Sequence, residues 1–273
     1  MATVNEKMTA IANAIRSKTG GTEALTLDDM ASGVNEVYNK GGEEGYNSGI
    51  EKGRTLEHSD FWDNINTLAS YRFAGTAWNK NTFKPNKDIT VGNFGFYYHN
   101  WQGTAYDLAA QLENAGVTLT LNSAADQQTF YYAWFTRLPE LNFTKCSGAF
   151  DRVFQGDSQL VTIDKIILPP EGNVTSFNAP FTDCTKLKNI IFEGVIDKSI
   201  TFSPCPLSAT SIKSVIFCLK DYSGTSNEHT YTVTFKTSAF NTLEAEGSTA
   251  EYNGVPCTWA ELIDNKKWNL VKA

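Results

Sequence analysis

The stretch that decides the fold occurs twice, as Phe154-Gln-Gly-Asp-Ser-Gln-Leu-Val-Thr-Ile163 and as Phe181-Thr-Asp-Cys-Thr-Lys-Leu-Lys-Asn-Ile190. In both copies an aromatic residue is followed six residues later by a leucine, and three residues after that by a second aliphatic residue. A unit this short cannot bury its apolar side alone, so it must stack on copies of itself. The repeat therefore predicts a solenoid, which presents a long surface and suits a binding or structural protein better than an enzyme.

Two weaker copies flank this pair. The earlier copy consists of Tyr132, Leu138 and Leu141. The later copy keeps Ile212 and Val215, but Pro206 stands where the aromatic residue is expected. The anchor positions then lie 22, 27 and 25 residues apart, within the range of periods that solenoids use. We therefore expect a short and irregular solenoid over residues 94–220.

The composition is that of a globular, acidic protein. Of its 273 residues, 41% are hydrophobic and 19% are charged, which favours a folded chain over a disordered one. The formal net charge is −7, and no run of Lys and Arg is present. Because phosphate binding needs clustered cations, we exclude nucleic acid as a partner.

The sequence contains no targeting or membrane signal. Its start, Met1-Ala-Thr-Val-Asn-Glu, lacks the basic and apolar regions of a secretory signal, and no stretch approaches the roughly 20 apolar residues of a membrane span. We expect a protein made in the cytoplasm without membrane insertion. The cysteines are odd in number and lack CxxC spacing, so we expect inert thiols, no metal and no cofactor. They are Cys146, Cys184, Cys205, Cys218 and Cys257.

Residues 1–39 are expected to form a helical hairpin that anchors the protein. Ile11 and Ile15 lie on one apolar helical face, Gly20 and Gly21 end that helix, and a second apolar face follows. About 35 residues are too few to bury a core of their own. We therefore expect the hairpin to dock onto a copy of itself or onto a larger assembly, with Ile11 and Ile15 in the contact.

A run of glycines at every fourth position follows, at Gly41, Gly45, Gly49 and Gly53. It could be a flexible linker. In a helix the same spacing places the glycines on one stripe, where neighbouring chains can approach closely. Each glycine costs a helix about 1 kcal/mol relative to alanine, so packing between chains must offset about 4 kcal/mol. We favour the helix, because a linker has no reason to keep this period. We expect a helical stalk over 40–70 and a connector over 71–93.

The repeats should end in a cap over residues 221–273, because the last turn of a solenoid needs a polar outer side. Local signals support this organisation. They predict a helix through Leu108 and Leu112 that ends at Gly116, a strand through Val233, a helix that opens with a capping box of Thr258 and Glu261, and a last strand at Trp268-Asn-Leu270.

We expect no enzymatic activity. No phosphate-binding loop, HExxH, GxSxG or EF-hand pattern is present. The histidines, His58, His99 and His229, are far apart, and none adjoins a cysteine. Four aspartates on the repeats could form a glycosidase pair, although Asp157 and Asp183 are better explained as residues that shape turns. The four are Asp151, Asp157, Asp164 and Asp183.

Two aromatic clusters, at 94–101 and 130–135, are candidates for contact with other molecules. Tyr97, Tyr98, Trp101, Tyr131 and Trp134 cannot all face inward, because neighbouring side chains in a strand alternate. Exposed Tyr and Trp provide contact area at low entropic cost and suit stacking on sugar rings. Burial in the core or in a subunit interface is the competing interpretation.

Several stretches resemble parts of known phage proteins. Met8-Thr-Ala-Ile-Ala-Asn-Ala-Ile-Arg-Ser-Lys-Thr-Gly-Gly, with Leu25-Thr-Leu-Asp-Asp-Met, resembles the leader of many tail and baseplate proteins from phages and prophages of Gram-positive bacteria. The glycine-stepped stretch ending at Phe61-Trp62 resembles what commonly follows that leader. Phe150–Val195 resembles BspA-type leucine-rich repeats, and Trp259–Leu270 resembles the end cap of phage repeat proteins.

The resemblance implies an α+β protein of the virion. Its N-terminal helical oligomerisation segment would precede a short, irregular leucine-rich-repeat (BspA-type) β-solenoid with a C-terminal cap. The protein would be a tail fibre, receptor-binding or baseplate component that serves host adsorption. Its partners would be its own copies as a homotrimer, other tail or baseplate subunits, and a host cell-surface glycan or protein. The alternatives are a tail-borne polysaccharide depolymerase and a bacterial leucine-rich-repeat surface adhesin.

The glycine stripe generates a first prediction. Replacing Gly45→Leu and Gly49→Leu should prevent close approach of neighbouring helices, so the oligomer is lost while the repeat domain stays folded. Light scattering measures the assembly and circular dichroism the fold. A double variant that stays multimeric would contradict the helical stalk.

Overall fold

The computed structural model describes residues 80–92, 94–121, 128–177 and 179–273, with single residues at 9, 12, 13, 73, 75 and 78. The chain divides into two units, Met1–Phe61 and Trp62–Ala273. The expected hairpin over 1–39 and stalk over 40–70 lie outside the described residues, apart from 9, 12 and 13. The oligomerisation residues also lie outside them. These are Ile11, Ile15, Gly41, Gly45, Gly49 and Gly53.

A ladder of stacked phenylalanine rings runs through the second unit. Each ring lies on the ring of the next turn, with centroids 4.9 to 5.8 Å apart. All of these rings are buried, and they belong to Phe73, Phe96, Phe130, Phe154, Phe181, Phe202 and Phe235. Hydrogen-bonded strands lie about 4.8 Å apart. One flat ring per turn therefore fills the core at nearly the same spacing as the backbone.

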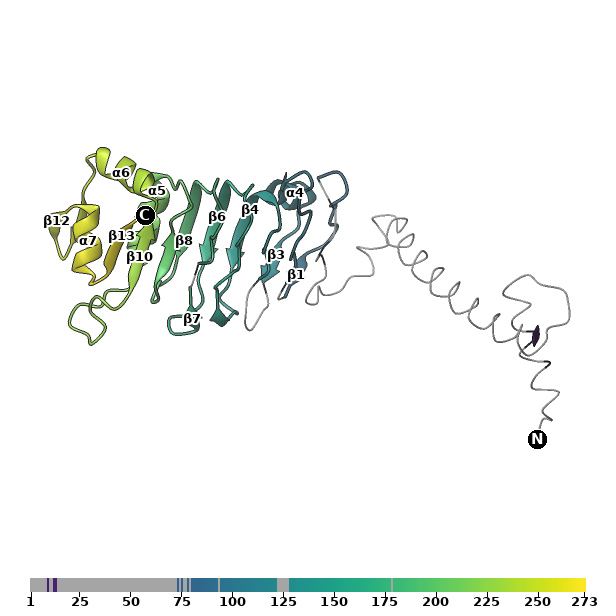
Figure 1. Cartoon of the computed structure of the whole chain (residues 1–273), viewed down its shortest axis with the longest axis horizontal. Coiled ribbons are helices and arrows are strands. Elements are labelled where there is room, and N and C mark those ends of the chain that lie inside the picture. Colours follow the sequence, from purple (N-terminus) through teal and green to yellow (C-terminus); the bar gives the residue numbers. More distant parts are fainter. Residues whose placement is uncertain are drawn as a thin grey trace, which may run out of the picture. The chain divides into compact units, whose positions relative to one another are not determined.

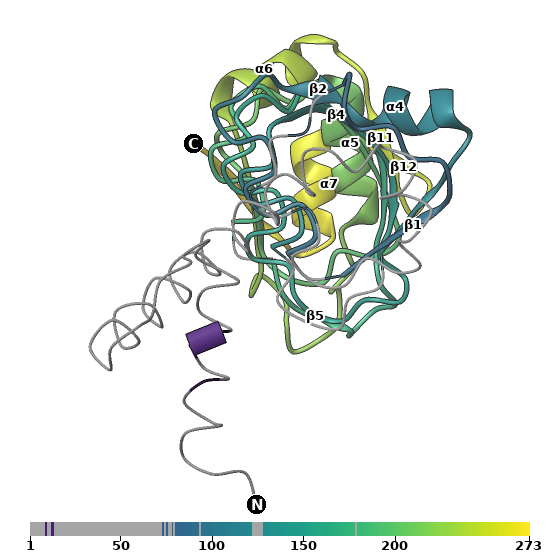
Figure 2. The same ribbon diagram turned by 90° about the vertical axis from the view of Figure 1, so that its right-hand side faces the viewer.

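The backbone that carries this ladder forms parallel strands lying side by side (Figure 1). The largest sheet has the order β2-β4-β6-β8, made of Tyr106–Asp107, Phe135–Asn142, Thr162–Ile167 and Asn189–Glu193. Leu138 pairs with Ile163, and Ile163 pairs with Ile190. All three side chains are buried. Seen along the stack, successive turns of the backbone overlap (Figure 2).

Smaller sheets complete each turn. β1 (Ile89–Val91) pairs with β3 (Leu119–Leu121), and β5 (Gly148–Ala149) pairs with β7 (Val174–Ser176). β10 (Thr232–Phe235) lies between β9 (Ile200–Phe202) and β13 (Asn269–Lys272). All these pairs are parallel. Among the named strands only β11 (Ala250–Tyr252) and β12 (Val255–Cys257) form an antiparallel pair.

The helices begin and end where local chemistry allows. α4 (Leu108–Ala115) ends at Gly116 in the left-handed conformation, which confirms that predicted helix. α6 spans Thr237–Ala245. α7 (Trp259–Asn265) opens with the predicted capping box, in which Thr258 and Glu261 bind each other's backbone amides.

The last helix to be introduced from the described residues, α5 (Ala209–Cys218), closes the edge of β8. The Ser211 hydroxyl accepts a hydrogen bond from the Ile190 amide at 2.9 Å, and the Ser214 hydroxyl accepts one from the Phe192 amide at 2.8 Å. An open strand edge invites pairing with another chain. These hydroxyls bind amides on the open edge of β8, so the sheet ends there without a further strand. The Lys266 ammonium donates to three carbonyl oxygens at the other end of α5. They belong to Ile216, Phe217 and Leu219.

The structure corrects both weaker copies of the repeat. Phe130, rather than Tyr132, stacks on Phe154. The fixed offsets also align Leu141 with Ile163, whereas in the structure Leu138 pairs with Ile163, three residues earlier. In the later copy Phe202, rather than Pro206, supplies the ring. Ile212 and Val215 lie on α5 instead of forming a further turn, because its serines take over the bonding of the β8 edge. The class of the repeat, a BspA-type leucine-rich solenoid, stays a prediction.

The ladder generates a second prediction. Phe154→Ala should lower the free energy of unfolding by about 3–5 kcal/mol, because it leaves a cavity between two stacked neighbours. The exposed Phe217 provides the matched control, and Phe217→Ala should cost no more than about 1 kcal/mol. Urea unfolding of both variants measures the difference. Equal losses would contradict a core built on this ladder.

Candidate functional site

Four of the five candidate aromatic residues come together on two adjacent turns. The rings of Tyr97 and Tyr131 are stacked, with centroids 5.2 Å apart. The ring of Tyr98 lies 5.6 Å from that of Tyr131 and meets Trp101 edge-on at 5.1 Å. These rings touch although the two turns are more than 30 residues apart in sequence, because the Phe96 and Phe130 rungs set the turns side by side.

A fifth ring, missed from the sequence, belongs to the same group. Tyr132 is stacked on Tyr98 at 5.2 Å and lies 5.9 Å from Trp101. The fixed repeat offsets predict Tyr132 in the core, but Phe130 lies there instead. We call Tyr97, Tyr98, Trp101, Tyr131 and Tyr132 the aromatic cluster.

Backbone conformation explains why neighbouring tyrosines share one side. Tyr98 and Tyr132 both have left-handed backbone, with φ of 53° and 52°. Such a residue interrupts the alternation of side chains that extended backbone imposes, so Tyr97 and Tyr98 both remain partly exposed. The two turns are tied together by the Tyr98 amide, which donates to the Tyr131 carbonyl at 2.8 Å.

Glycine ends the aromatic cluster on the next turn. Gly156 occupies the position equivalent to Tyr98 and Tyr132, with φ of 80°. A Cβ atom at Gly156 would collide with the ring of Tyr132, so the missing side chain leaves room for that ring. In the sequence, Tyr98, Tyr132 and Gly156 each stand two residues after a phenylalanine of the ladder. This shared position can be recognised only when Phe96 and Phe130 are known to be ladder residues.

The aromatic cluster is accessible from outside. Trp101 is 45% exposed, and the four tyrosines are half-buried. Burial and the neighbouring phenol groups raise the pKa of Tyr131, while Arg152 acts in the opposite direction. Trp134 lies apart, and within the described ranges no ring contact joins it to the aromatic cluster. Trp134 is half-buried, with φ of 51°.

Three of the four candidate carboxylates, those of Asp151, Asp157 and Asp164, are engaged in contacts between turns. Asp157 is fully buried and accepts a hydrogen bond from the Phe135 amide at 3.1 Å. Burial raises its pKa well above the usual range, against the effect of the Phe135 and Trp134 amides. Asp164 binds Arg137 through two contacts of 2.7 Å. Asp151 accepts a hydrogen bond from the Ser176 hydroxyl. These contacts favour a structural role.

His99 is also an interior residue. Its side chain is fully buried, stacks on Phe135 at 5.2 Å and places Nε2 2.8 Å from the Tyr106 hydroxyl oxygen. Burial lowers the pKa of His99 to about 3, so the imidazole is neutral at physiological pH. His229 is exposed, and His58 lies outside the described residues.

The described part of the chain shows no arrangement typical of a metal or redox site. No group of three or more His, Cys, Asp or Glu residues there is placed to hold a metal ion. Cys184 is fully buried, and burial raises the pKa of its thiol. No helix among these residues has the length and apolar character needed to cross a bilayer.

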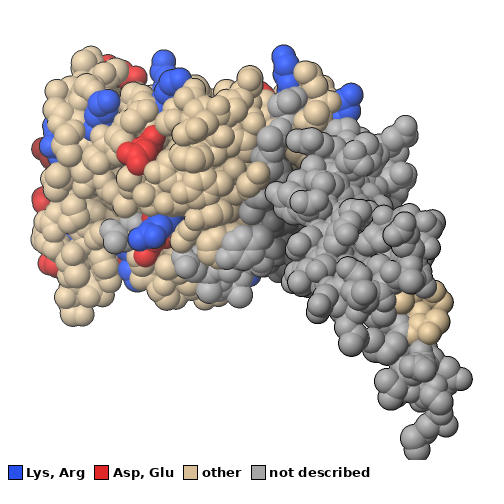
Figure 3. All heavy atoms as spheres, turned by 45° about the vertical axis from the view of Figure 1, so that its right-hand side comes forward, with Lys and Arg blue, Asp and Glu red and all other residues tan. Residues whose placement is uncertain are grey.

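Charged side chains are scattered over one face of the domain. On the face drawn in Figure 3, Lys, Arg, Asp and Glu stand apart within a broad uncharged area. Some charged residues of the domain form ion pairs between turns, such as Lys165 with Glu140 and Glu193. This face therefore has no basic cluster of the kind that a nucleic acid requires.

Compared with known proteins, the chain matches no family model, no curated protein and no solved structure.

The buried histidine generates a third prediction. The folded-state pKa of His99 lies below its unfolded value, so its contribution to stability is full above about pH 6.5 and is lost as the pH falls toward 3. Between pH 7 and pH 4.5, the free energy of unfolding of the wild type should fall by about 2.5 kcal/mol more than that of His99→Gln. His229→Asn is the matched control and should follow the wild type. Urea unfolding at both pH values measures this, and identical pH dependence of wild type and His99→Gln would contradict the burial of a neutral imidazole.

Proposed function

We propose that the chain is a structural and adhesive tail protein of a bacteriophage, which presents its stacked domain to the host surface through the aromatic cluster. The observation that carries the proposal is the arrangement of five partly exposed rings on adjacent turns. Soluble domains bury most of their aromatic side chains. A group of them left at the surface and fixed by mutual stacking is typical of a contact site.

The rigidity of the aromatic cluster suits binding. Two stacked tyrosine pairs hold each other, and Trp101 closes on both Tyr98 and Tyr132. Few side-chain rotations therefore have to be lost when a partner binds. Tyrosine and tryptophan rings pack against the C–H faces of sugars, and their polar atoms bind hydroxyl groups. A host cell-surface glycan or an extended protein segment fits this chemistry.

The place in a virion tail rests on the resemblance of the leader and of the repeats. In that arrangement residues 1–60 assemble a homotrimer and attach it to other tail or baseplate subunits, while the BspA-type leucine-rich-repeat solenoid lies distally. Several copies on one particle make weak individual contacts strong in sum. A tail-borne depolymerase is less well supported, because Asp157 and Asp164 are already engaged within the fold.

A fourth prediction tests this function. Fluorescently labelled full-length protein should bind purified cell walls from some members of a panel of Gram-positive bacteria. Trp101→Ala combined with Tyr131→Ala should weaken that binding at least about tenfold, as expected when two anchor residues are truncated. Phe217→Ala removes an exposed ring from α5 and should leave binding unchanged.

Two outcomes would contradict the proposal. Binding that survives the double substitution would remove the aromatic cluster from the contact. Absence of binding to every cell wall tested, with the protein folded and multimeric, would remove the adhesive role.

A further inference from the structure

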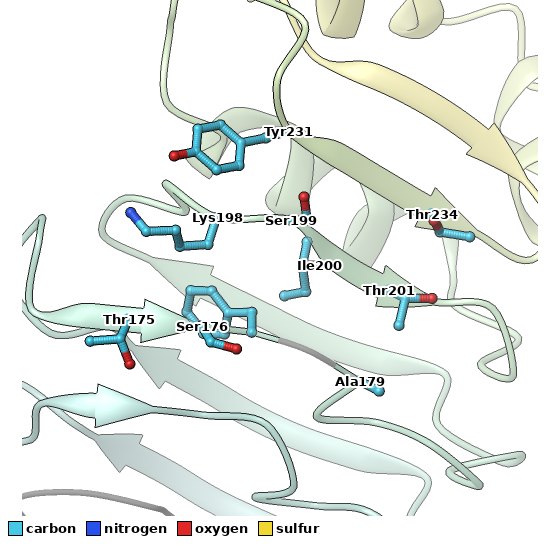
Figure 4. Close-up of a pocket in the computed structure, with 10 residues that line it drawn as sticks. Thr175, Ser176, Ala179, Lys198, Ser199, Ile200, Thr201, Tyr231 and Thr234 are labelled. Carbon is cyan, nitrogen blue, oxygen red and sulfur yellow. The ribbon is translucent and has the colours of Figure 1, made fainter. Parts of the chain in front are cut away.

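A groove with a different chemistry lies further along the same domain. It has a volume of about 360 Å³ and runs between β7, β9 and β10 (Figure 4). Tyr231 and Lys198 lie at one end, and Thr201 and Thr234 lie at the other. A parallel bridge between Phe177 and Ile200 joins the two sides, and both of these apolar residues line the groove.

Hydroxyl groups make up most of the polar lining. They come from Thr175, Ser176, Ser199, Thr201, Tyr231 and Thr234. Ser199 and Thr201 accept hydrogen bonds from the amides of Thr232 and Ser203. Because these two hydroxyls act as acceptors within the fold, their O–H groups can still donate to a ligand. The Ser176 hydroxyl already donates to Asp151, so it is left with acceptor capacity. Hydroxyls that offer both donors and acceptors are suited to a ligand that is itself rich in hydroxyls.

The Tyr231 end of the groove is held in place. Its ring packs against Tyr222 at 5.0 Å and against Trp268 at 5.7 Å. The Lys198 ammonium lies 5.6 Å from the Tyr231 ring centroid and 3.2 Å from the Asp197 carboxylate. Asp197 is nearly buried and is itself fixed by the Gly172 amide at 3.2 Å. The aromatic ring and the ammonium group are therefore positioned before a ligand arrives.

The charge of the groove narrows the ligand class. Lys198 is the cation among the lining residues, and Asp197 neutralises it. An anionic ligand would have to compete with a carboxylate 3.2 Å from that ammonium. A neutral ligand can accept a hydrogen bond from the ammonium without disturbing the pair. The volume is at the small end of the range for small-molecule sites, of the order of a mono- or disaccharide.

We propose that this groove binds a neutral saccharide, with its hydroxyl groups on the Thr and Ser row and its C–H face against the partly exposed ring of Tyr231. The site is separate from the aromatic cluster, which lies on turns near residues 97–132, whereas the groove lies between residues 175 and 234. The inference deepens the proposed function, since a host surface glycan would supply such a sugar. The binding chemistry itself does not depend on where the protein acts.

Saturation-transfer NMR on the full-length protein tests the site. The probes are glucose, galactose, N-acetylglucosamine and rhamnose, with glucuronate as the anionic comparison. At least one neutral sugar should show transfer, and glucuronate should show little. Thr175→Trp fills the groove and should weaken binding at least about tenfold. Thr120→Trp is the matched control, because both threonines are exposed at the centre of a three-residue parallel strand, and it should bind like the wild type.

A second variant covers the case in which tryptophan disturbs the fold. Thr234→Val keeps the shape of a strand residue and removes one groove hydroxyl, so it should weaken binding about fivefold, as for one lost hydrogen bond. The proposal would be overturned if Thr234→Val binds the sugar as tightly as the wild type does. If Thr175→Trp stays folded, it must also weaken binding for the proposal to stand. Binding of glucuronate alone, or of no neutral sugar, would also overturn it.

The outcomes separate this inference from the proposed function. If Trp101→Ala with Tyr131→Ala abolishes the sugar signal and the groove variants do not, the sugar binds the aromatic cluster and the groove proposal is wrong. If the groove variants abolish the signal while cell walls are not bound, the groove proposal stands and the adhesive role fails.

Discussion

The structure depends on one constraint, that each turn must bury its apolar side against the next turn. The phenylalanine ladder meets this constraint at every step, with ring separations of 4.9 to 5.8 Å. Parallel backbone pairing holds the same interval on the sheet side. Rings and strands therefore repeat together, and aliphatic residues such as Leu138, Ile163 and Ile190 fill the space between them.

The same constraint creates the exposed surfaces. Equivalent positions of successive turns lie next to each other, so whatever residue type occupies one position forms a row. Tyr98 and Tyr132 share the left-handed position and become a stacked pair, whereas Gly156 ends that row on the next turn. Hydroxyl-bearing residues on three later segments form the groove in the same way. A stack of this kind builds binding sites by adjacency rather than by folding a loop over a ligand.

The ends of the stack require separate solutions. At β8 the hydroxyls of Ser211 and Ser214 bind the edge amides that a further strand would have used. Lys266 then satisfies carbonyl oxygens at the end of α5. Beyond this point the sheet of β9, β10 and β13 continues the ladder to Phe235, so the helix closes one sheet while the aromatic rungs continue.

Part of this arrangement could be read from the sequence. Phe154 and Phe181 can be identified from their shared offsets to Leu and Ile, and local signals predict α4 and the capping box of α7. Phe130 and Phe202 cannot be identified from fixed offsets, because the ladder advances by unequal numbers of residues. The step from Phe96 to Phe130 contains the helix α4, and the step from Phe202 to Phe235 contains the helix α5.

The candidate site was predictable to a similar degree. Alternation of side chains correctly indicated that some aromatic residues must be exposed, and Trp101 is. It could not assign Tyr132 to the aromatic cluster, because the left-handed backbone at Tyr98 and Tyr132 breaks the alternation on which the argument rests. The groove left no motif, since its hydroxyls come from short segments whose threonines and serines are unremarkable one by one.

The most direct test of the ladder is a set of nuclear Overhauser contacts between phenylalanine rings in protein carrying isotope-labelled phenylalanine. Rings on adjacent rungs should show contacts, from Phe130 to Phe154 and from Phe154 to Phe181, and Phe154 should show none to Phe235. Absence of the contact between Phe154 and Phe181, whose centroids lie 5.2 Å apart, would contradict the stacked arrangement on which both surfaces rest.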